Sequence, residues 1–127
     1  MKHIQVLKPK YRVDECLSEI KQCLDIGWTG MGYKTIEFEN QWKTYTGLNH
    51  AHFLNSASAG LHLAVKILKE KHDWQDDDEI ITTPLTFIST NHSIIYENLK
   101  PCFADIDDSL NLNPQSVKEK INKKTKA

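Results

Sequence analysis

The chain has 127 residues, a length that suits a single domain of modest size with one hydrophobic core. Its 16 basic and 17 acidic side chains leave a formal net charge of −1, so no overall positive field points to a nucleic-acid partner. The apolar runs are too short to cross a membrane, and the N-terminus MKHIQVLKPK lacks the apolar core of a signal peptide, so we expect a cytoplasmic location.

We predict that residues 1–48 form a helical lead-in segment. A helix is expected from Asp14, as N-cap, to Gly27, with apolar side chains at helical spacing. The glycine-punctuated loop WTGMGYK follows it. A second helix is expected over about 35–46, and its aromatic face consists of Phe38, Trp42 and Tyr45.

Residues 49–127 differ in character, because short apolar segments alternate there with helices. Strands are predicted at 50–54, 79–83 and 101–106, and helices at 58–71, 87–97 and 114–122. The helix at 58–71 has apolar residues on both sides, so we expect it to be buried over much of its circumference. The alternation predicts an α/β fold, with an incomplete parallel sheet covered by helices on both faces.

The turn NSASAG, residues 55–60, joins the first predicted strand to the following helix, and ligands of α/β folds bind at such junctions. Amides at the N-terminus of a helix attract anions. Ser58 adds a hydroxyl donor there, while Ala59 and Gly60 offer nearly bare backbone amides. Two interpretations stay open: a phosphate site, or a helix cap supplied by Ser56 or Ser58.

The second strand-to-helix junction, TTPLTFISTNHS, places Phe87 at the start of the next predicted helix. An aromatic ring at the carboxyl edge of a parallel sheet is suited to stacking on a planar cofactor. The alternative is that Phe87 packs in the core, as most phenylalanines do.

No metal site is expected. The cysteines lack metal or redox spacing and are expected to be buried thiols, and the histidines lack accompanying carboxylates or thiolates and are expected to be structural. The residues concerned are Cys16, Cys23 and Cys102, and His50, His52 and His62.

Five motifs follow one another in a familiar order: GWTGMGYKTIEFENQW, NSASAGLHLA, DEIITTPLTFIST, KPCFADID and the tail KTKA. Together they resemble the DegT/StrS family of pyridoxal-phosphate (PLP)-dependent sugar aminotransferases, which have the aspartate-aminotransferase-like fold. The resemblance covers nearly the whole chain. It implies the N-terminal part of such an enzyme, with 1–48 as a lead-in and 49–127 as the truncated start of the PLP-binding large domain.

The resemblance also implies roles for individual residues. Ser58 takes the family's hydroxyl position on the cofactor phosphate, Ala59 supplies the neighbouring amide, and Phe87 stacks on the pyridine ring. The loop implied to lie near the substrate contains Trp28, Thr29 and Gly30. Asp77 stands where family members usually have glycine, and we expect no harm from this because aspartate tolerates turn conformations.

The resemblance implies that the chain has no catalytic lysine. The family's Schiff-base lysine lies well downstream, in a context that none of the lysines here shares. In the family's sheet, four later strands separate the first predicted strand from the second, so segment 50–54 would lack a neighbour for its backbone groups. We therefore expect the chain alone to be poorly folded and inactive.

The implied function is transfer of an amino group from an amino acid, with glutamate as the expected donor, to a keto sugar linked to a nucleotide. The parent enzyme is expected to be a homodimer, without nucleic-acid or membrane partners. The alternatives are a non-catalytic fragment and a PLP-dependent sugar dehydratase of the same fold. A flavodoxin-like nucleotide-binding domain would instead require residues 50–54 to pair with 79–83.

Overall fold

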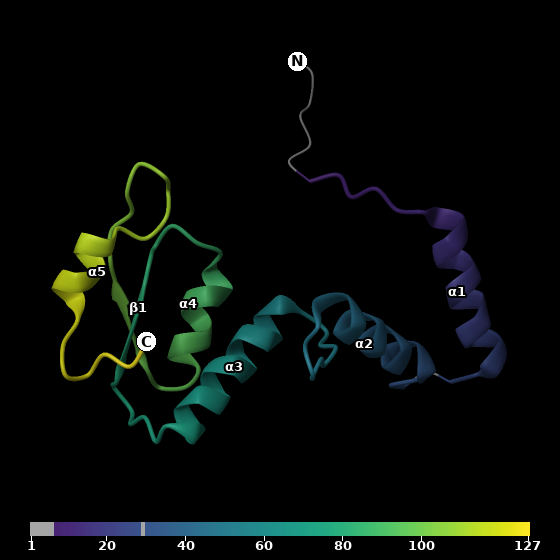
Figure 1. Ribbon diagram of the computed structural model, residues 1–127, viewed down its shortest axis with the longest axis horizontal. Coiled ribbons are helices and arrows are strands. Elements are labelled where there is room, and N and C mark those ends of the chain that lie inside the picture. The colour runs from purple at the N-terminus through teal and green to yellow at the C-terminus, as the bar shows by residue number, and fades with distance from the viewer. Residues whose placement is uncertain (1–6, 29) are drawn as a thin grey trace, which may run out of the picture. The chain divides into compact units, whose positions relative to one another are not determined.

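The computed structural model describes residues 7–28 and 30–127 (Figure 1). The chain divides into two compact units, Met1–Phe53 and Leu54–Ala127. The domain boundary that was expected after residue 48 stays a prediction. The first unit contains the helices α1 (Val13–Ile26) and α2 (Tyr33–Thr46). The second contains α3 (Ala57–Lys71), β1 (Glu79–Thr82), α4 (Ile88–Ile95), β2 (Lys100–Phe103) and α5 (Pro114–Lys120).

Helix α1 begins two residues earlier than predicted. Arg12 is its N-cap residue, so the assignment of that position to Asp14 was wrong. Asp14 and Glu15 lie in the first turn, where negative charge interacts favourably with the helix dipole, and no side chain caps the helix. The helix ends at Gly27, whose φ of 72° is a left-handed conformation that glycine adopts without strain.

The predicted aromatic face of α2 is confirmed. The rings of Phe38 and Trp42 stack with their centroids 6.3 Å apart, and Trp42 lies 5.9 Å from Tyr45. This helix ends at Gly47, which again has a left-handed φ, of 73°.

Residues 50–54 do not form the predicted strand. The amide of Phe53 instead donates a hydrogen bond to the carboxylate of Glu39 on α2, at 2.7 Å, and its ring meets Phe38 edge-on at 5.7 Å. A strand needs a neighbour for its backbone groups, and no strand in the described part of the chain pairs with this segment. The flavodoxin-like alternative, which required pairing with residues 79–83, is therefore wrong.

The sheet of the second unit is parallel, as predicted. Strands β1 and β2 pair with Glu79 opposite Lys100 and Thr82 opposite Phe103. The last residues of the chain pair with the other edge of β1: Glu79 donates to the Lys124 carbonyl and accepts from the Lys126 amide, both at 2.8 Å. Strand β1 is therefore central, a position that the sequence analysis did not predict.

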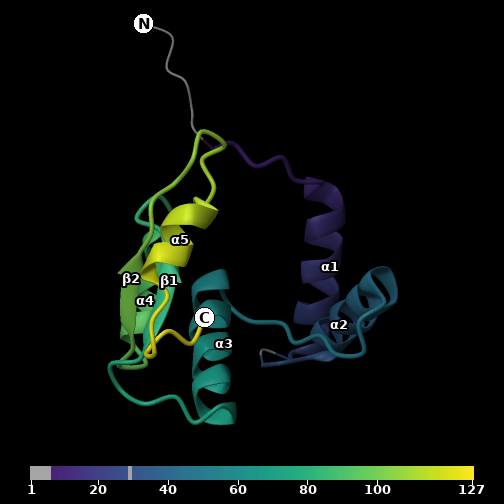
Figure 2. The ribbon, with the colours of Figure 1, turned by 60° about the vertical axis from the view of Figure 1, so that its left-hand side comes forward.

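Helices cover both faces of this sheet, as predicted. Helices α3 and α4 pack together on one side, and α5 lies on the other (Figures 1 and 2). In both views α3 and α4 run opposite to the strands, so their first turns lie toward the end where the strands finish. Asn113 caps α5 as expected, and its side chain accepts hydrogen bonds from the amides of Gln115 and Ser116.

The core of the second unit is small. Among the described residues, the buried apolar side chains are Ile94, Leu99 and Ala104. No residue of α3 is buried, so the prediction for that helix was wrong. The buried-thiol prediction was wrong as well, because Cys16 is exposed and Cys23 and Cys102 are partly exposed.

The turn before β1 explains how aspartate replaces the usual glycine. Asp77 has a φ of 67°, in the left-handed region, and its amide donates to the Asn98 carbonyl at 2.9 Å. Its carboxylate lies 2.8 Å from the Lys100 ammonium, and this contact lowers the pKa of Asp77. The expectation that aspartate tolerates this turn is confirmed.

Two further expectations concern ions and membranes. Within residues 7–28 and 30–127, no group of three or more potential ligands is placed to bind a metal ion. In the same residues, no helix is both long and apolar enough to span a bilayer.

Candidate functional site

The first turn of α3 contains both predicted contacts to the cofactor phosphate, Ser58 and Ala59. Ser56 is the N-cap residue, and its hydroxyl oxygen accepts a hydrogen bond from the Ala59 amide at 3.1 Å. The Gly60 amide donates to the Ser56 carbonyl at 3.2 Å. The cap interpretation is thus confirmed for Ser56, and the amides of Ala59 and Gly60 both have hydrogen-bond partners within the turn.

Two donors remain at this turn. The amides of Ala57 and Ser58 have no hydrogen-bond partner among the described residues, and the Ser58 side chain is exposed. They lie at the positive end of a 15-residue helix, where the dipole favours an anion. The turn therefore offers two backbone donors and one hydroxyl to a phosphate. The Ala59 amide would become a third backbone donor if its hydrogen bond to the Ser56 hydroxyl broke.

Gly60 has a packing role that the sequence analysis missed. A Cβ atom at this position would lie 3.4 Å from the Cδ1 atom of Leu54. A side chain at Gly60 would therefore contact Leu54, the residue that precedes the turn.

Phe87 lies at the head of α4 and is not part of the core. It is the N-cap residue, with extended backbone angles, and it is 76% exposed. The interpretation of Phe87 as a core residue was therefore wrong. The first turns of α3 and α4 both lie toward the end of the sheet where the strands finish (Figures 1 and 2), so Ser58 and Phe87 belong to the same end of this unit.

The predicted substrate loop lies in the first unit, and Thr29 falls outside the described residues. The Trp28 ring nitrogen donates to the Met31 carbonyl at 3.0 Å, and the ring lies against Gly30 and Gly32. The structure thus brings Trp28 and Gly30 together. They border a hollow of about 210 Å³ whose lining consists of Cys23, Trp28, Gly30, Gly32, Tyr33, Lys34 and Thr35.

We expect Gly32→Ala to displace the Trp28 ring. A Cβ atom at Gly32 would lie 2.9 Å from Trp28 Cδ1, which is too close for two carbons, so the ring must move and lose its bond to Met31. The indole N–H resonance of Trp28 checks this, and it should move toward its free-solution position. Gly30→Ala is the matched control, because its Cβ would sit at an ordinary 3.7 Å from the ring. An unchanged Trp28 resonance in Gly32→Ala would contradict the packing.

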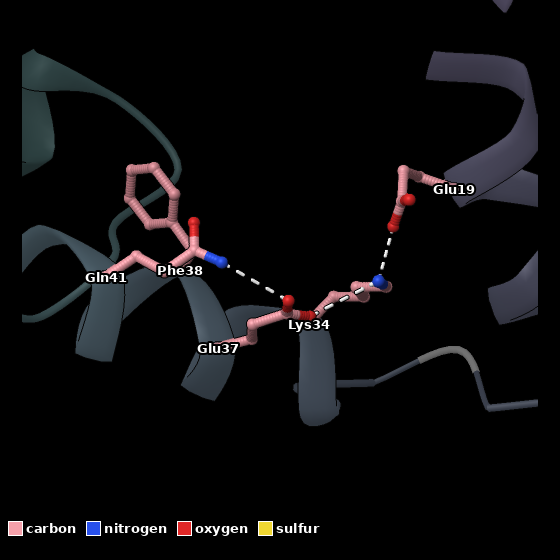
Figure 3. Close-up of a pocket in the computed structure, with 5 residues that line it drawn as sticks. All are labelled: Glu19, Lys34, Glu37, Phe38 and Gln41. Carbon is pink, nitrogen blue, oxygen red and sulfur yellow. Dashed lines mark hydrogen bonds and ion pairs between the residues drawn. The ribbon is translucent and has the colours of Figure 1, made fainter. Parts of the chain in front are cut away.

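A second hollow of about 280 Å³ lies beside α2 (Figure 3). Lys34 contacts the Glu19 carboxylate and lies 3.2 Å from that of Glu37, which also accepts from Gln41 at 3.2 Å. The hydrogen bond from Lys34 lowers the pKa of Glu19, and its two carboxylate partners raise the pKa of Lys34. Because the cation is already neutralised, we assign no anionic ligand to this hollow.

We expect the stability of the first unit to depend on this ion pair at both ends of the pH scale. The lowered pKa of Glu19 means that its stabilising effect is present above 4.5 and disappears as the pH falls through the folded-state value. The raised pKa of Lys34 means that its contribution is complete below 10.5 and is lost at higher pH.

NMR titration of the Glu19 side-chain carboxyl carbon checks the direction of its pKa shift. Glu19→Gln should abolish the part of the stability that is lost as the pH falls. Glu15→Gln is the matched control, since Glu15 pairs with Arg12 on the same helix, at 2.9 Å. A Glu19 midpoint at or above that of a free glutamate would show that the pair does not form in solution.

The sequence profile of the DegT/DnrJ/EryC1/StrS aminotransferase family matches residues 11–127. The chain belongs to this family. Its motifs therefore predicted the family correctly, and its fold is confirmed as part of the fold-type I sugar aminotransferase structure.

Two relatives illustrate the relationship. The chain is 40% identical over 115 residues to the uncharacterized protein MJ1066 of Methanocaldococcus jannaschii, covering 90% of this chain and 29% of that protein. It is 38% identical over 114 residues to the spore coat polysaccharide biosynthesis protein SpsC of Bacillus subtilis, covering 89% and 28%. The chain thus spans less than a third of the length of these relatives.

Two solved structures resemble the chain closely. Spr1654 of Streptococcus pneumoniae, provisionally named a sugar aminotransferase and solved in its PLP form, gives a TM-score of 0.85 at 28% identity, covering 97% of this chain and 30% of that one. A GDP-4-keto-6-deoxymannose-3-dehydratase with a trapped PLP-glutamate geminal diamine gives 0.86 at 25% identity, covering 98% and 33%.

Proposed function

We propose that this chain supplies the phosphate-binding turn and the ring-stacking aromatic of a PLP site. The enzyme to which it belongs would transfer an amino group from an amino acid to a keto sugar linked to a nucleotide. Membership of the family supports this, as do a relative named for polysaccharide biosynthesis and a structural neighbour named for a GDP-linked keto sugar. PLP, when bound, supplies the electron sink that amino-group transfer requires.

The observation that carries the proposal is the pair of helix starts in the second unit. The Ala57 and Ser58 amides and the Ser58 hydroxyl would hold the phosphate, with the Ala59 amide beside them. The exposed ring of Phe87 would stack on the pyridine. These residues fit the cofactor, because they offer hydrogen-bond donors to an anion and an uncovered aromatic face to a planar ring.

The other parts of the proposal concern the substrates and the partner subunit. Glutamate is the proposed amino donor, in keeping with the PLP-glutamate adduct of the dehydratase neighbour. Trp28, Thr29 and Gly30 would form the substrate end of the site. We further propose that the complete enzyme is a homodimer.

A sugar dehydratase is the second candidate, because the dehydratase neighbour matches the fold as well as Spr1654 does. The family resemblance implies that the two classes differ at the residue that carries the cofactor, lysine in the transferases and histidine in the dehydratases. The two classes can be told apart from the gene sequence of the region that corresponds to the later part of the relatives, where the cofactor-carrying residue is expected.

Titration of the ¹⁵N-labelled chain with PLP, pyridoxal and inorganic phosphate tests the cofactor site. A well-dispersed amide spectrum is the first requirement, and it would also contradict the expectation that the chain alone is poorly folded. We expect PLP and phosphate to shift the amides of Ala57 and Ser58, and PLP to bind more tightly than phosphate. Ser58→Ala should weaken both by about tenfold, since it removes a hydrogen bond to a charged group. Phe87→Ala should weaken PLP alone.

Matched controls are Ser18→Ala and Tyr96→Ala, which remove an exposed hydroxyl of the first unit and an exposed ring at the far end of α4 from Phe87. Neither should change the affinity for PLP. Shifts confined to other parts of the chain, or equal effects of the control variants, would overturn the proposed site.

A further inference from the structure

A polar network fastens the end of β1 to α4. The hydroxyl of Thr82, the last residue of β1 and only 6% exposed, donates to the Asn91 side-chain oxygen at 2.8 Å. The Asn91 amide nitrogen donates in turn to the Thr83 carbonyl at 3.2 Å. One side chain of α4 therefore contacts both the last strand residue and the first residue of the connection that follows.

The connection of residues 83–87 is held by further hydrogen bonds of the same kind. The Leu85 amide donates to the Thr83 hydroxyl at 3.1 Å, and the Thr90 amide donates to the Phe87 carbonyl at 3.0 Å. The hydroxyls of Thr86 and Thr90 lie 3.3 Å apart. The backbone that carries Phe87 is thus fixed at both of its ends.

The ring of Phe87 depends on that backbone for its position. It is largely exposed, and no aromatic pair in the described part of the chain includes it. A side chain without packing neighbours is placed mainly by its own backbone, and stacking on a flat ligand tolerates only small errors in position and tilt. Asn91 lies one helical turn after Phe87, on the same side of α4.

We propose that Asn91 is a positioning residue for PLP, which sets the height and tilt of the Phe87 ring by tying the start of α4 to the end of β1. The proposal rests on the proposed function, because it names a second residue on which ring stacking depends. Asn91 would contact neither the phosphate nor the ring. Its loss should therefore reduce the part of the affinity that comes from the pyridine and leave the part that comes from the phosphate.

The test compares the affinities of the chain for PLP and for inorganic phosphate, both measured by ¹⁵N NMR titration. Asn91→Ala is expected to weaken PLP at least fivefold and to change phosphate less than twofold, as Phe87→Ala does. Thr82→Val keeps the volume but removes the donor to Asn91, so it should act in the same direction. Thr82→Ser keeps the hydroxyl and should restore the wild-type ratio of the two affinities.

Ser93→Ala is the control for general destabilisation of α4. Ser93 is as buried as the core, and its hydroxyl donates to the Thr90 carbonyl within the same helix, at 2.7 Å. This variant should lower stability without altering the ratio of PLP to phosphate affinity. The ¹³C resonances of the Phe87 ring give a direct readout, which should move in Asn91→Ala and stay in place in Ser93→Ala.

The outcomes separate the two proposals. If the wild-type chain prefers PLP over phosphate and Phe87→Ala removes that preference, the proposed function stands. Retention of the preference in Asn91→Ala and Thr82→Val would then overturn the positioning role, and so would an equal loss of PLP and phosphate affinity. A wild-type chain without any preference for PLP overturns the proposed function and this inference with it.

Discussion

Replacing Ile94 with alanine is expected to lower the free energy of unfolding of the Leu54–Ala127 unit by about 3 kcal/mol. Ile94 is 3% exposed and lies on α4, between α3 and the sheet. The cost combines the lost transfer of the side chain from water with the cavity that it leaves. Because Ile94 is one of few buried apolar side chains in the described chain, this loss is a large share of the stability of a small unit.

Urea denaturation followed by circular dichroism measures this effect, with amide hydrogen exchange of β1 as a second probe. Ile95→Ala is the matched control, since the same change is made one residue later on the same helix, at a side chain that is 52% exposed. We expect it to cost no more than about 0.5 kcal/mol. Similar losses in the two variants would show that the core does not form around Ile94 in solution.

Replacing Glu97 with alanine is expected to lower the free energy of unfolding by about 1 to 2 kcal/mol, because the carboxylate is largely buried but its partners are partly exposed to solvent. The Glu97 carboxylate, 12% exposed, lies 2.6 Å from His62 Nε2 and 3.8 Å from the Lys66 ammonium, both on α3. The Glu97 backbone carbonyl accepts from Lys69 at 2.6 Å. Glu97, two residues after the end of α4, thus joins this end of α4 to α3. Its replacement leaves a part-buried imidazole without its partner, although the backbone contact to Lys69 is kept.

Glu70→Ala provides the comparison for Glu97. Glu70 also pairs with Lys66, at 3.3 Å, but it is exposed, and surface ion pairs contribute little. Thermal unfolding of both variants should show a clear decrease in midpoint for Glu97→Ala and almost none for Glu70→Ala. Equal midpoints would mean that water satisfies His62 as well as Glu97 does.

The sequence predicted the features that depend on neighbouring residues. The helix ends at Gly27 and Gly47, the cap at Asn113 and the left-handed turn at Asp77 each follow from the conformational preference of one residue. The short apolar segments predicted the parallel pair of strands, because a run of neighbouring apolar residues is typical of a buried strand. The order of the motifs was sufficient to identify the family.

The tertiary structure decided the features that depend on residues far apart in the chain. Whether residues 50–54 form a strand depends on a pairing partner, and the described part of the chain supplies none. The free edge of β1 pairs with residues 124–127, which lie far from it in the sequence. Burial of α3 and of the cysteines depends likewise on which layers cover them. Hydrogen bonds such as those of Glu97 and Asn91 join separate elements and leave no local signal in the sequence.

The candidate site shows the same division. Ser58 and Phe87 were predicted from the sequence because both follow recognisable junctions and match motifs of the family. The use of the Ala59 amide by Ser56, the contact between Gly60 and Leu54 and the support of Phe87 by Asn91 required the structure. Residue type and order along the chain determine which groups a site contains, whereas packing in three dimensions determines which of them remain free to bind.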